Sequence, residues 1–137
     1  MADLTWAVQK AVHGALAGIT APGREEGAPV ACPTYDHQPE NAPFPFIVLS
    51  GQNVVPDDTL DADGSIHTLY LSIWSQYRGQ RQVLAIMASI ADRLHNARLL
   101  LDVGCALSCR VRNRLTSREP DDITYQGAMT IQIIASS

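Results

Sequence analysis

Charged residues are scarce in this chain. Asp, Glu, Lys and Arg make up 18% of its 137 residues, and the formal net charge is -4, whereas average proteins carry about 25% charged residues. Hydrophobic residues account for 46%. This composition excludes a disordered chain and argues against a protein that wraps nucleic acid by bulk positive charge. A domain with so few charges must still stay soluble, and covering part of its surface with copies of itself is one way.

Long hydrophobic runs are also missing. The longest unbroken apolar run extends from Val83 to Ala88, far short of the roughly 20 residues that a membrane-spanning helix needs. The first residues lack the basic start and apolar stretch of a signal peptide. We therefore expect a protein without a membrane segment, made and kept in a cytoplasm. A length of 137 residues suits one domain, residues 1–137, and leaves no room for two ordinary ones.

Cysteine is rare as well, with three in the chain. In ordinary strand geometry, Cys105 and Cys109 would lie on one face about 13 Å apart, too far for a disulfide. Their spacing is not the Cys-x-x-Cys of zinc sites or redox motifs. We therefore expect these two cysteines, and Cys32, to be small buried hydrophobic residues in a reducing compartment.

Two segments have the three- and four-residue spacing of apolar side chains that is typical of amphipathic helices. The first runs from Asp3, which can cap it, to about Gly18, and the second runs from about Gln80 to Asn96. Between them, seven of the eight prolines lie between Pro22 and Pro56. Proline, glycine and aspartate favour connecting segments, so we predict loops at about 20–29 and 52–64.

Alternation of apolar and polar residues predicts the strands. A long strand spans residues 65–76, and a hairpin follows the second helix, with arms at about 105–115 and 123–133 and a turn at 118–122. Shorter strands are predicted at 30–35 and 45–51. This order predicts a single α+β domain: an antiparallel β-sheet with two helices packed on one face.

The sequence contains no motif for catalysis or metal binding. The four histidines, at positions 13, 37, 67 and 95, are not spaced as ligands, so we expect them at the surface or at the edge of the core. The Asp63-Gly64 turn with its preceding aspartates matches part of a calcium loop, but no glutamate follows at the twelfth position, which favours a solvated loop or an acidic patch. Nucleophile elbows, phosphate loops and dinucleotide fingerprints are absent. We therefore expect no enzyme, no metal and no cofactor.

The charges that are present are segregated. The loop at 52–64 is acidic, and arginines alternate along one predicted strand face. Those arginines form either a solvated outer face or a contact surface for an acidic partner or a phosphate backbone. A head-to-tail contact between acidic loop and basic strand, repeated by rotation, closes a ring. With two aromatic residues of the long strand, which is apolar on both faces, the candidate subunit-interface residues are Asp57, Asp58, Asp61, Asp63, Arg110, Arg112, Arg114, Arg118, Tyr70 and Trp74.

Several local strings, in this element order, resemble a known family. They are Val30-Ala-Cys-Pro-Thr-Tyr-Asp36, Pro43-Phe-Pro-Phe-Ile-Val-Leu-Ser-Gly51, His67-Thr-Leu-Tyr-Leu-Ser-Ile-Trp-Ser-Gln-Tyr-Arg-Gly79 before the second helix, and the closing strand from Gly127. Over nearly its whole length the chain resembles the small tail-completion, or tail-terminator, proteins of long-tailed phages and gene transfer agents. The most specific piece is Trp74-Ser75, followed by a turn and Gly79 before a helix.

The resemblance implies a structural virion protein. It implies a homo-oligomer, commonly a hexameric ring, that caps the end of the tail tube, stops tube polymerisation and provides the surface for the head connector or adaptor. DNA would pass through the lumen without sequence-specific binding, and the protein would sit at the tail-neck junction of a virion or phage-like particle. The family has no catalytic residues to carry over. Two alternatives stay open: another neck or head-completion adaptor, and a small soluble enzyme or ligand-binding domain.

Overall fold

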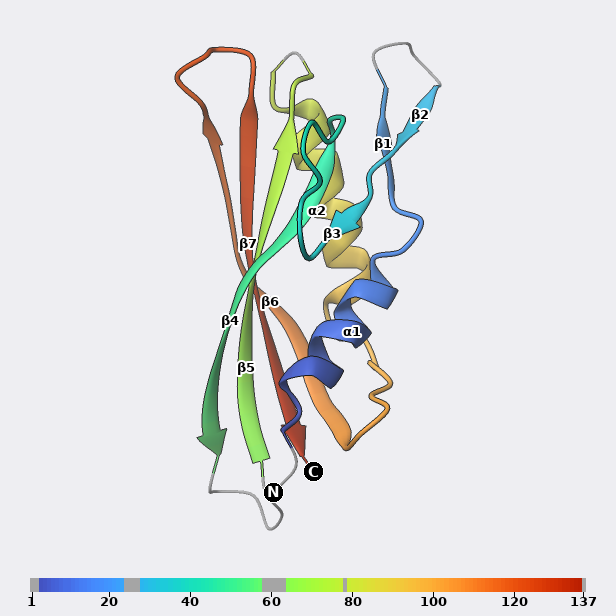
Figure 1. Cartoon of the computed structure of the whole chain (residues 1–137), viewed down its shortest axis with the longest axis vertical. Helices are drawn as coiled ribbons and strands as arrows, with labels where there is room; N and C mark the ends of the chain where they lie inside the picture. The colour runs from blue at the N-terminus through green and yellow to red at the C-terminus, as the bar shows by residue number, and fades with distance from the viewer. Residues whose placement is uncertain (1–2, 24–27, 58–63, 78, 137) are drawn as a thin grey trace.

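Two helices pack on one face of a five-stranded sheet, and a small two-stranded ribbon lies beside them (Figure 1). The structure is a computed structural model that describes residues 3–23, 28–57, 64–77 and 79–136. Its elements are α1 (Thr5–Ala15), β1 (Thr20–Pro22), β2 (Pro29–Ala31), β3 (Thr34–Tyr35), β4 (Phe46–Asp57), β5 (Gly64–Ser75), α2 (Arg81–Leu94), β6 (Cys105–Arg118) and β7 (Tyr125–Ser136). The predicted α+β fold with helices on one face is confirmed.

Helix α1 is shorter than the predicted segment. It begins at Thr5, whose backbone N–H donates to the Asp3 carboxylate at 3.0 Å. Its buried side includes Val8 and Val12, both fully buried. The helix ends at Ala15, and Gly18 follows in the left-handed region at φ 77°, where glycine carries no steric penalty. The apolar stripe and the glycine therefore fix this helix much as its sequence predicts.

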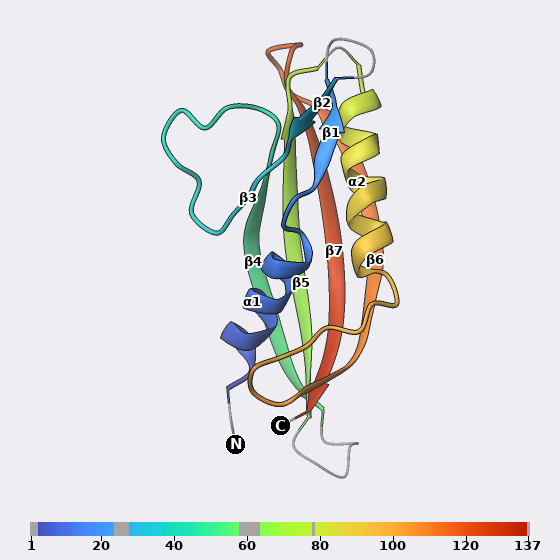
Figure 2. The same cartoon turned by 90° about the vertical axis from the view of Figure 1, so that its right-hand side faces the viewer.

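Helix α2 covers the upper half of the sheet (Figure 2). Its apolar stripe, including Val83, Ile86 and Ile90, is completely buried, as the spacing predicts. The helix comes closest to the sheet at Gly127 of β7, where an added Cβ would lie 2.9 Å from a Val83 methyl group and 3.0 Å from the Met87 sulfur. A glycine at this position allows the close approach.

The sheet has the strand order β3-β4-β5-β7-β6. The long strands pair antiparallel: β4 with β5, β5 with β7, and β7 with β6. The short β3 pairs parallel with β4, so the sheet is mixed, not wholly antiparallel as predicted. Strand β5 directs His67, Leu69, Leu71, Ile73 and Ser75 toward the helices, and all five are buried, which confirms the predicted face.

Two of the predicted loops are partly strand. Strand β4 continues past Gly51, with a register shift there, and pairs with β5 as far as Asp57, so the predicted loop at 52–64 is wrong over 52–57. Each face of the segment from Gln52 to Val55 carries one polar residue and one valine, so its own alternation is weak, and its pairing with β5 supplies the strand. Likewise, residues 20–22 and 29 of the predicted loop at 20–29 belong to the β1-β2 ribbon.

Strand β6 departs most from its predicted alternation. Its pairing with β7 shifts between Ala106 and Ser108 and again between Val111 and Asn113. Such bulges turn the following side chains to the other face. Cys105 therefore pairs with Ser136 and is exposed, whereas Cys109 pairs with Ile133 and is buried. The predictions that these two cysteines share a face, and that both are buried, are wrong.

The molecule is elongated along its strands. The β6-β7 turn lies at one end, called here the upper end, and both marked chain ends lie at the opposite, lower end (Figure 1). Both helices cover the same side of the sheet (Figure 2). The other side of the sheet, which we call the open face, has no helix or strand layered over it among the described residues; the segment before β4 covers only its upper end, where Phe44 packs on the buried Phe46.

Candidate functional site

The open face is the broadest surface that the fold leaves uncovered. It receives alternate residues of the four long strands. From the register, the central positions are Ile66, Thr68, Tyr70, Ser72 and Trp74 of β5 and Gln126, Ala128, Thr130, Gln132 and Ile134 of β7. The flanking strands contribute Phe46, Val48, Gly51, Asn53, Val55 and Asp57 of β4 and Cys105, Ser108, Arg110, Asn113, Leu115 and Ser117 of β6.

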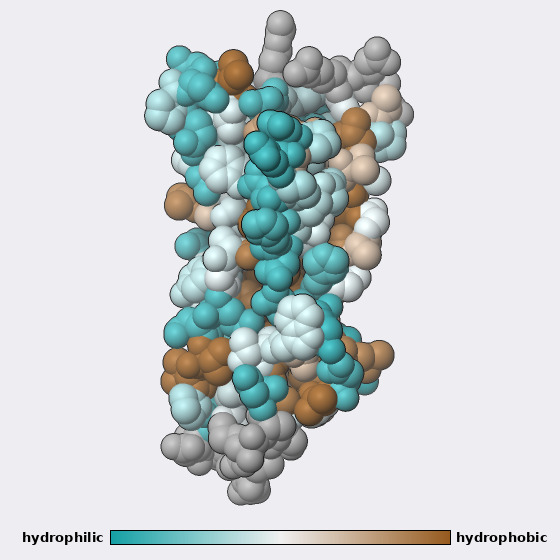
Figure 3. Space-filling view, viewed as in Figure 1, coloured by the Kyte–Doolittle hydropathy of each residue, from teal (hydrophilic) through white to brown (hydrophobic). Residues whose placement is uncertain are grey.

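This face is almost without charge. Among its paired positions only Asp57 and Arg110 are charged. Most of its central side chains are half-buried, while Val55, Tyr70 and Leu115 are 47%, 44% and 62% exposed. In the view of Figure 1, Figure 3 shows apolar side chains gathered over the lower part of β4. There Val55 is exposed on the open face, and Val54, which pairs with His67, is exposed on the opposite face. The scarcity of charge in the sequence is therefore concentrated on one face.

Tyr70 and Trp74, two predicted interface residues, both lie on the open face. Tyr70 pairs with Thr130 in the middle of the sheet, and Trp74 pairs with Gln126 and Phe46 near its upper end. Trp74 is half-buried. The structure thus brings these two residues onto one surface, as their spacing predicts. Uncharged polar and apolar side chains of β5 and β7 surround them.

The acidic interface residues lie mostly outside the described residues. Asp57 is the last residue of β4 and pairs with Gly64 at the lower end of the sheet. Asp58, Asp61 and Asp63 fall in the segment 58–63, which the structure does not describe. Asp57 is therefore the anchor point for this predicted loop, at the end of the molecule opposite to the β6-β7 turn.

The three strand arginines do not share one face, so that prediction is wrong. Arg110 pairs with Gln132 on the open face, whereas Arg114 pairs with Met129 on the helix face, because the shift between Val111 and Asn113 absorbs Arg112. All three arginines are exposed. Within the described ranges none of the three has an ion pair with a carboxylate.

A hollow of about 530 Å³ separates the end of α2 from this edge strand. Its walls include Asp92 of α2, His95 just after the helix, and both Arg112 and Arg114 of β6. The Val111 N–H donates to His95 Nδ1 at 3.1 Å, and the Asn96 N–H donates to the Cys109 carbonyl at 2.8 Å. These bonds occupy part of the outer edge of β6, and the exposed arginines project beyond it.

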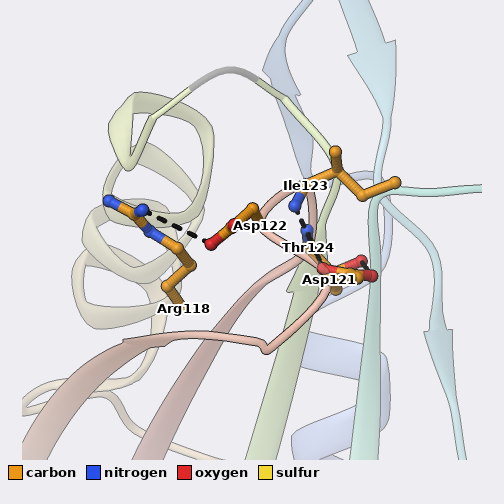
Figure 4. Close-up of polar contacts among 5 residues, drawn as sticks. All are labelled: Arg118, Asp121, Asp122, Ile123 and Thr124. Atoms are coloured by element: carbon orange, nitrogen blue, oxygen red, sulfur yellow. Dashed lines mark hydrogen bonds and ion pairs between the residues drawn. The ribbon is translucent and has the colours of Figure 1, made fainter.

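Arg118, the fourth predicted arginine, lies at the upper end. Its guanidinium is 3.6 Å from an Asp122 carboxylate oxygen and 5.9 Å from the centre of the Tyr125 ring. Figure 4 shows the pair of Arg118 and Asp122 in the β6-β7 turn. Because both side chains of this pair are more than half exposed, the contact contributes little to stability. Arg118 is thus partnered within its own chain, unlike the three strand arginines.

An aromatic hollow of about 410 Å³ lies at the upper end of the open face. It is lined by Gln38, Phe44, Phe46, Trp74, Glu119, Pro120, Asp121 and Thr124. The rings of Phe44 and Phe46 have centroids 5.0 Å apart. Phe44 is 39% exposed, whereas Phe46 is 2% exposed. The hollow thus combines aromatic walls with two carboxylates, which is a surface suited to a cation.

The carboxylate of Asp121 is fixed within the turn. It accepts hydrogen bonds from the backbone N–H groups of Ile123 and Thr124 at 3.0 and 2.8 Å, and from the Thr124 hydroxyl at 2.7 Å (Figure 4). These bonds, that of the Thr124 side chain first, lower the pKa of Asp121, so this carboxylate stays negatively charged. Glu119 donates its backbone N–H to the Thr124 carbonyl, and its carboxylate makes no ion pair within the described residues.

A buried polar network lies at the lower end of the core. His67 is 1% exposed; its Nε2 is 2.7 Å from the Ser65 hydroxyl, and its Nδ1 is 2.7 Å from the Gln52 side-chain oxygen. The Gln52 amide in turn donates to the Thr5 carbonyl at 3.3 Å. The prediction that His67 lies at the surface or at the edge of the core is therefore wrong. Its ring joins β5, β4 and the start of α1.

The same network resembles a serine-histidine pair in outline only. Ser65 and His67 are 7% and 1% exposed, so neither reaches a substrate in solution. The third member is an amide, Gln52, rather than a carboxylate. Burial lowers the pKa of His67, and the negative charge of Asp3 partly opposes this. The sequence does not bring these side chains together, because it predicts a loop at Gln52, whereas in the structure Gln52 lies in β4 and pairs with β5.

Other chemistry is sparse in the described part of the chain. No group of three or more potential metal ligands occurs in residues 3–23, 28–57, 64–77 and 79–136. Burial raises the pKa of the Cys32 thiol to about 12 and that of Cys109 to about 11, so both thiols stay protonated and unreactive at neutral pH. None of the described helices has the length and apolarity needed to cross a membrane.

A family model described as tail completion protein gp17 matches residues 23–136. The chain belongs to this family. The match spans β2, the whole five-stranded sheet and α2, and it begins after α1 and β1. Membership in the tail completion family makes the chain a structural component of a phage-type tail and of a virion or phage-like particle. The predicted resemblance is therefore confirmed, and no curated protein matches the chain in sequence.

A solved structure supports the fold of this tail completion protein. A chain from "Virion of native gene transfer agent (GTA) particle" matches with a TM-score of 0.68 and 18% sequence identity. The match covers 76% of this chain and 78% of the other. At this identity the likeness concerns the arrangement of helices and strands.

Two further features were not predicted from the sequence. The aromatic hollow joins the segment before β4 to the β6-β7 turn, which are far apart in the chain. The Gln82 side chain is buried and accepts a hydrogen bond from Ser75 at 2.6 Å while donating to the Pro22 carbonyl at 2.7 Å. The available signals were the aromatic residues around Pro45 and a glutamine at a stripe position of α2.

Proposed function

We propose that this tail completion protein forms a ring on the end of the tail tube, terminates tube polymerisation and provides the surface for head-tail joining. The ring is commonly hexameric in the tail-terminator proteins that the sequence resembles. Its partners are further copies of itself, the tail tube protein, and the head connector or adaptor. The proposed location is the tail-neck junction of a virion or phage-like particle, whose parts assemble in a bacterial cytoplasm.

The observation that carries this proposal is the open face. Its four long strands of about twelve residues span about 750 Å² at ordinary strand spacing. A standard-size interface buries about 800 Å² on each partner. An exposed sheet face of this size with Asp57 and Arg110 as its charged paired positions fits a surface that neighbouring subunits cover. A solitary soluble domain would gain solubility from charges there.

The same face suits a ring through which DNA passes. Positive side chains on a lumen would bind the phosphate backbone through counterion release. The open face contributes mostly Thr, Ser, Gln and apolar residues, and the net charge of the chain is -4. Where this face borders the lumen, it offers few positive groups to bind the phosphate backbone, and DNA would pass without sequence-specific contacts. No catalytic group is needed for this role.

The charged interface residues remain part of the proposal. One side of the proposed contact uses Asp57, at the lower end of the sheet, together with Asp58, Asp61 and Asp63, which follow it in the sequence. The other side uses Arg110, Arg112, Arg114 and Arg118 of the edge strand β6. Tyr70 and Trp74 add aromatic area on the open face. A contact between different surfaces of adjacent copies is head-to-tail, and repeating it by rotation closes a ring.

Deleting the gene and imaging the resulting particles by electron microscopy tests the proposed function. Loss of the protein is expected to leave tails that are overlong or not joined to heads. Joined tails of normal length would overturn the terminator role. Tails of normal length that stay unjoined would instead favour another neck or head-completion adaptor, which docks elsewhere and does not control length.

A further inference from the structure

We infer that the aromatic hollow at the upper end of the open face receives the Arg114 guanidinium of a neighbouring copy of this chain. This inference rests on the proposed ring and names one anchoring contact within it. The aromatic rings of Phe44, Phe46 and Trp74 line the hollow, and Glu119 and Asp121 on its lining supply negative charge.

The chemistry of the hollow selects a cation with a flat face. Tryptophan attracts cations more strongly than other aromatic side chains. A guanidinium stacks on aromatic rings and also binds carboxylates through paired N–H donors, whereas an ammonium group does so as a point charge. Asp121 keeps its charge through three hydrogen bonds within the turn. Glu119 has no internal ion pair in the described part of the chain and is the carboxylate that can turn toward a guest.

The chain itself supplies the matching cations. Arg110, Arg112 and Arg114 are exposed on the edge strand and lack carboxylate partners among the described residues. Arg118 is already paired with Asp122. The chain has nine arginines and one lysine, so a hollow that prefers a guanidinium suits a partner of its own kind.

Arg114 is the arginine whose position fits best. The register places it on the helix face, opposite Met129, whereas Trp74 lies on the open face, opposite Gln126. If the helix side of one copy's edge strand overlaps the open face of the next, these two residues face each other. Along the strand they are offset by three residues, about 10 Å, which a small tilt between copies and a long side chain can span.

Such a contact leaves both surfaces available on every copy. Each molecule uses its hollow toward one neighbour and its arginine toward the other, so the contact is head-to-tail and repeats around a ring. In an isologous dimer, the hollow and the arginine of each copy would both be occupied by the same partner, and assembly would stop at two copies. The inference therefore adds a specific ion pair between copies, Glu119 with Arg114, away from Asp57 at the lower end of the sheet.

A mixing experiment with Glu119→Arg and Arg114→Glu tests the contact. Either variant alone places like charges opposite each other at every interface, which we expect to weaken assembly at least about tenfold. When the two variants alternate around a ring, the substituted side chains meet as a charge-reversed pair at one interface, and the native side chains meet at the next. Co-expression of both variants in cells that lack the native gene should therefore restore joined particles to near the wild-type yield.

Matched controls use the same charge changes away from the hollow. Arg98→Glu is the control for Arg114→Glu, and Glu40→Arg is the control for Glu119→Arg. Neither Arg98 nor Glu40 lines the hollow. Each control variant keeps the native Glu119 and Arg114, so when expressed alone it should support joined particles at close to the wild-type yield. Circular dichroism on each purified variant establishes that it is folded before the particles are counted.

The outcomes separate this inference from the proposed function. Unimpaired single variants, or folded single variants that fail to complement each other, overturn the contact between hollow and arginine while wild-type particles still depend on the protein. If Asp61→Arg alone is impaired and its co-expression with Arg114→Glu restores joined particles, the arginine is assigned to the acidic segment and the inference is overturned. If the wild-type gene is dispensable for joined tails of normal length, the proposed function fails first.

Discussion

At the scale of single residues, Gly127 sets how closely α2 approaches the sheet. The position has no Cβ, and one built there would lie 2.9 Å from Val83 and 3.0 Å from the Met87 sulfur. Both neighbours are buried and belong to a closely packed core that resists local expansion. The strand alternation of the sequence places residue 127 on the inner face but does not indicate the distance to the helix above it.

Gly127→Ala should lower the free energy of unfolding by about 1–3 kcal/mol, because overpacking a filled core forces neighbouring side chains away. Chemical denaturation followed by circular dichroism measures the change. Gly14→Ala in α1 is the matched control: an added Cβ meets no atom within 4 Å, and alanine favours the helix by up to about 1 kcal/mol. Equal effects of the two substitutions would show that helix packing does not limit residue 127.

His67 should make stability depend on pH in the mildly acidic range. Burial lowers the pKa of the folded-state imidazole below its ordinary value of 6.5. Between the folded and unfolded pKa values the unfolded chain binds more protons, so stability rises with pH. The contribution is complete above the unfolded pKa and is lost as pH falls toward and through the folded one.

Denaturation at pH 7 and at pH 5 tests this expectation. The free energy of unfolding of the wild type should fall between the two, and that of His67→Gln should fall less, because glutamine does not titrate. The carboxylates of Asp3, Asp102 and Asp121, whose pKa values are lowered by hydrogen bonds, act below their ordinary value of 3.8 and leave this window unaffected. An equal drop in both proteins would contradict the role of His67.

At the scale of elements, periodicity predicts those segments that have one fully buried side. Helix α2 and strands β5 and β7 match their predicted ranges within a few residues, because the helices and the inner sheet face bury a regular set of apolar side chains. Strand β6 is an edge strand with two register shifts, so the alternation of its residues does not indicate which side chains lie on which face of the sheet. The second half of β4 gains its structure from pairing with β5 rather than from its own composition, and a single sequence carries no signal for that pairing.

Gln82 joins three elements that sequence patterns treat separately. It lies on α2 and is hydrogen-bonded to Ser75 at the end of β5 and to the Pro22 carbonyl in β1. Gln82→Ala should destabilise the protein by about 1–3 kcal/mol, because two buried partners lose their hydrogen bonds. Leu84→Ala, on the outer side of the same helix where Leu84 is 47% exposed, should change the free energy of unfolding much less. Thermal denaturation of both variants checks the difference, and equal losses would contradict it.

At the scale of the whole molecule, the scarcity of charged residues in the sequence corresponds to one surface of the fold, the open face. The open face concentrates uncharged side chains, while Arg110, Arg112 and Arg114 are exposed along the edge strand β6, and Asp57 and the β6-β7 turn place acidic residues at the two ends. Composition predicts that part of the surface is covered, but it does not indicate which part. The aromatic hollow depends on the β6-β7 turn meeting the segment before β4, a tertiary contact that no local pattern reveals.

Thr130→Glu places a charge in the middle of the open face. Thr130 is half-buried and pairs with Tyr70 and Asn113. We expect little change in the stability of the isolated chain, about 1 kcal/mol or less, but strong loss of particle assembly, because a charge buried at an interface must be desolvated. Ala88→Glu on the exposed side of α2 is the control and should leave the yield of joined particles close to that of the wild type. Equal yields from both variants would contradict the covered open face.

The central claim is that copies of this protein form a ring at the head-proximal end of the tail tube. Reconstructing that end of isolated particles by electron cryomicroscopy tests it most directly. We predict a single ring of copies stacked on the last tube layer, with the open face of each copy covered by a neighbour or bordering the lumen. Copies distributed along the tube, or a tube end occupied by other proteins without this chain, would contradict the claim.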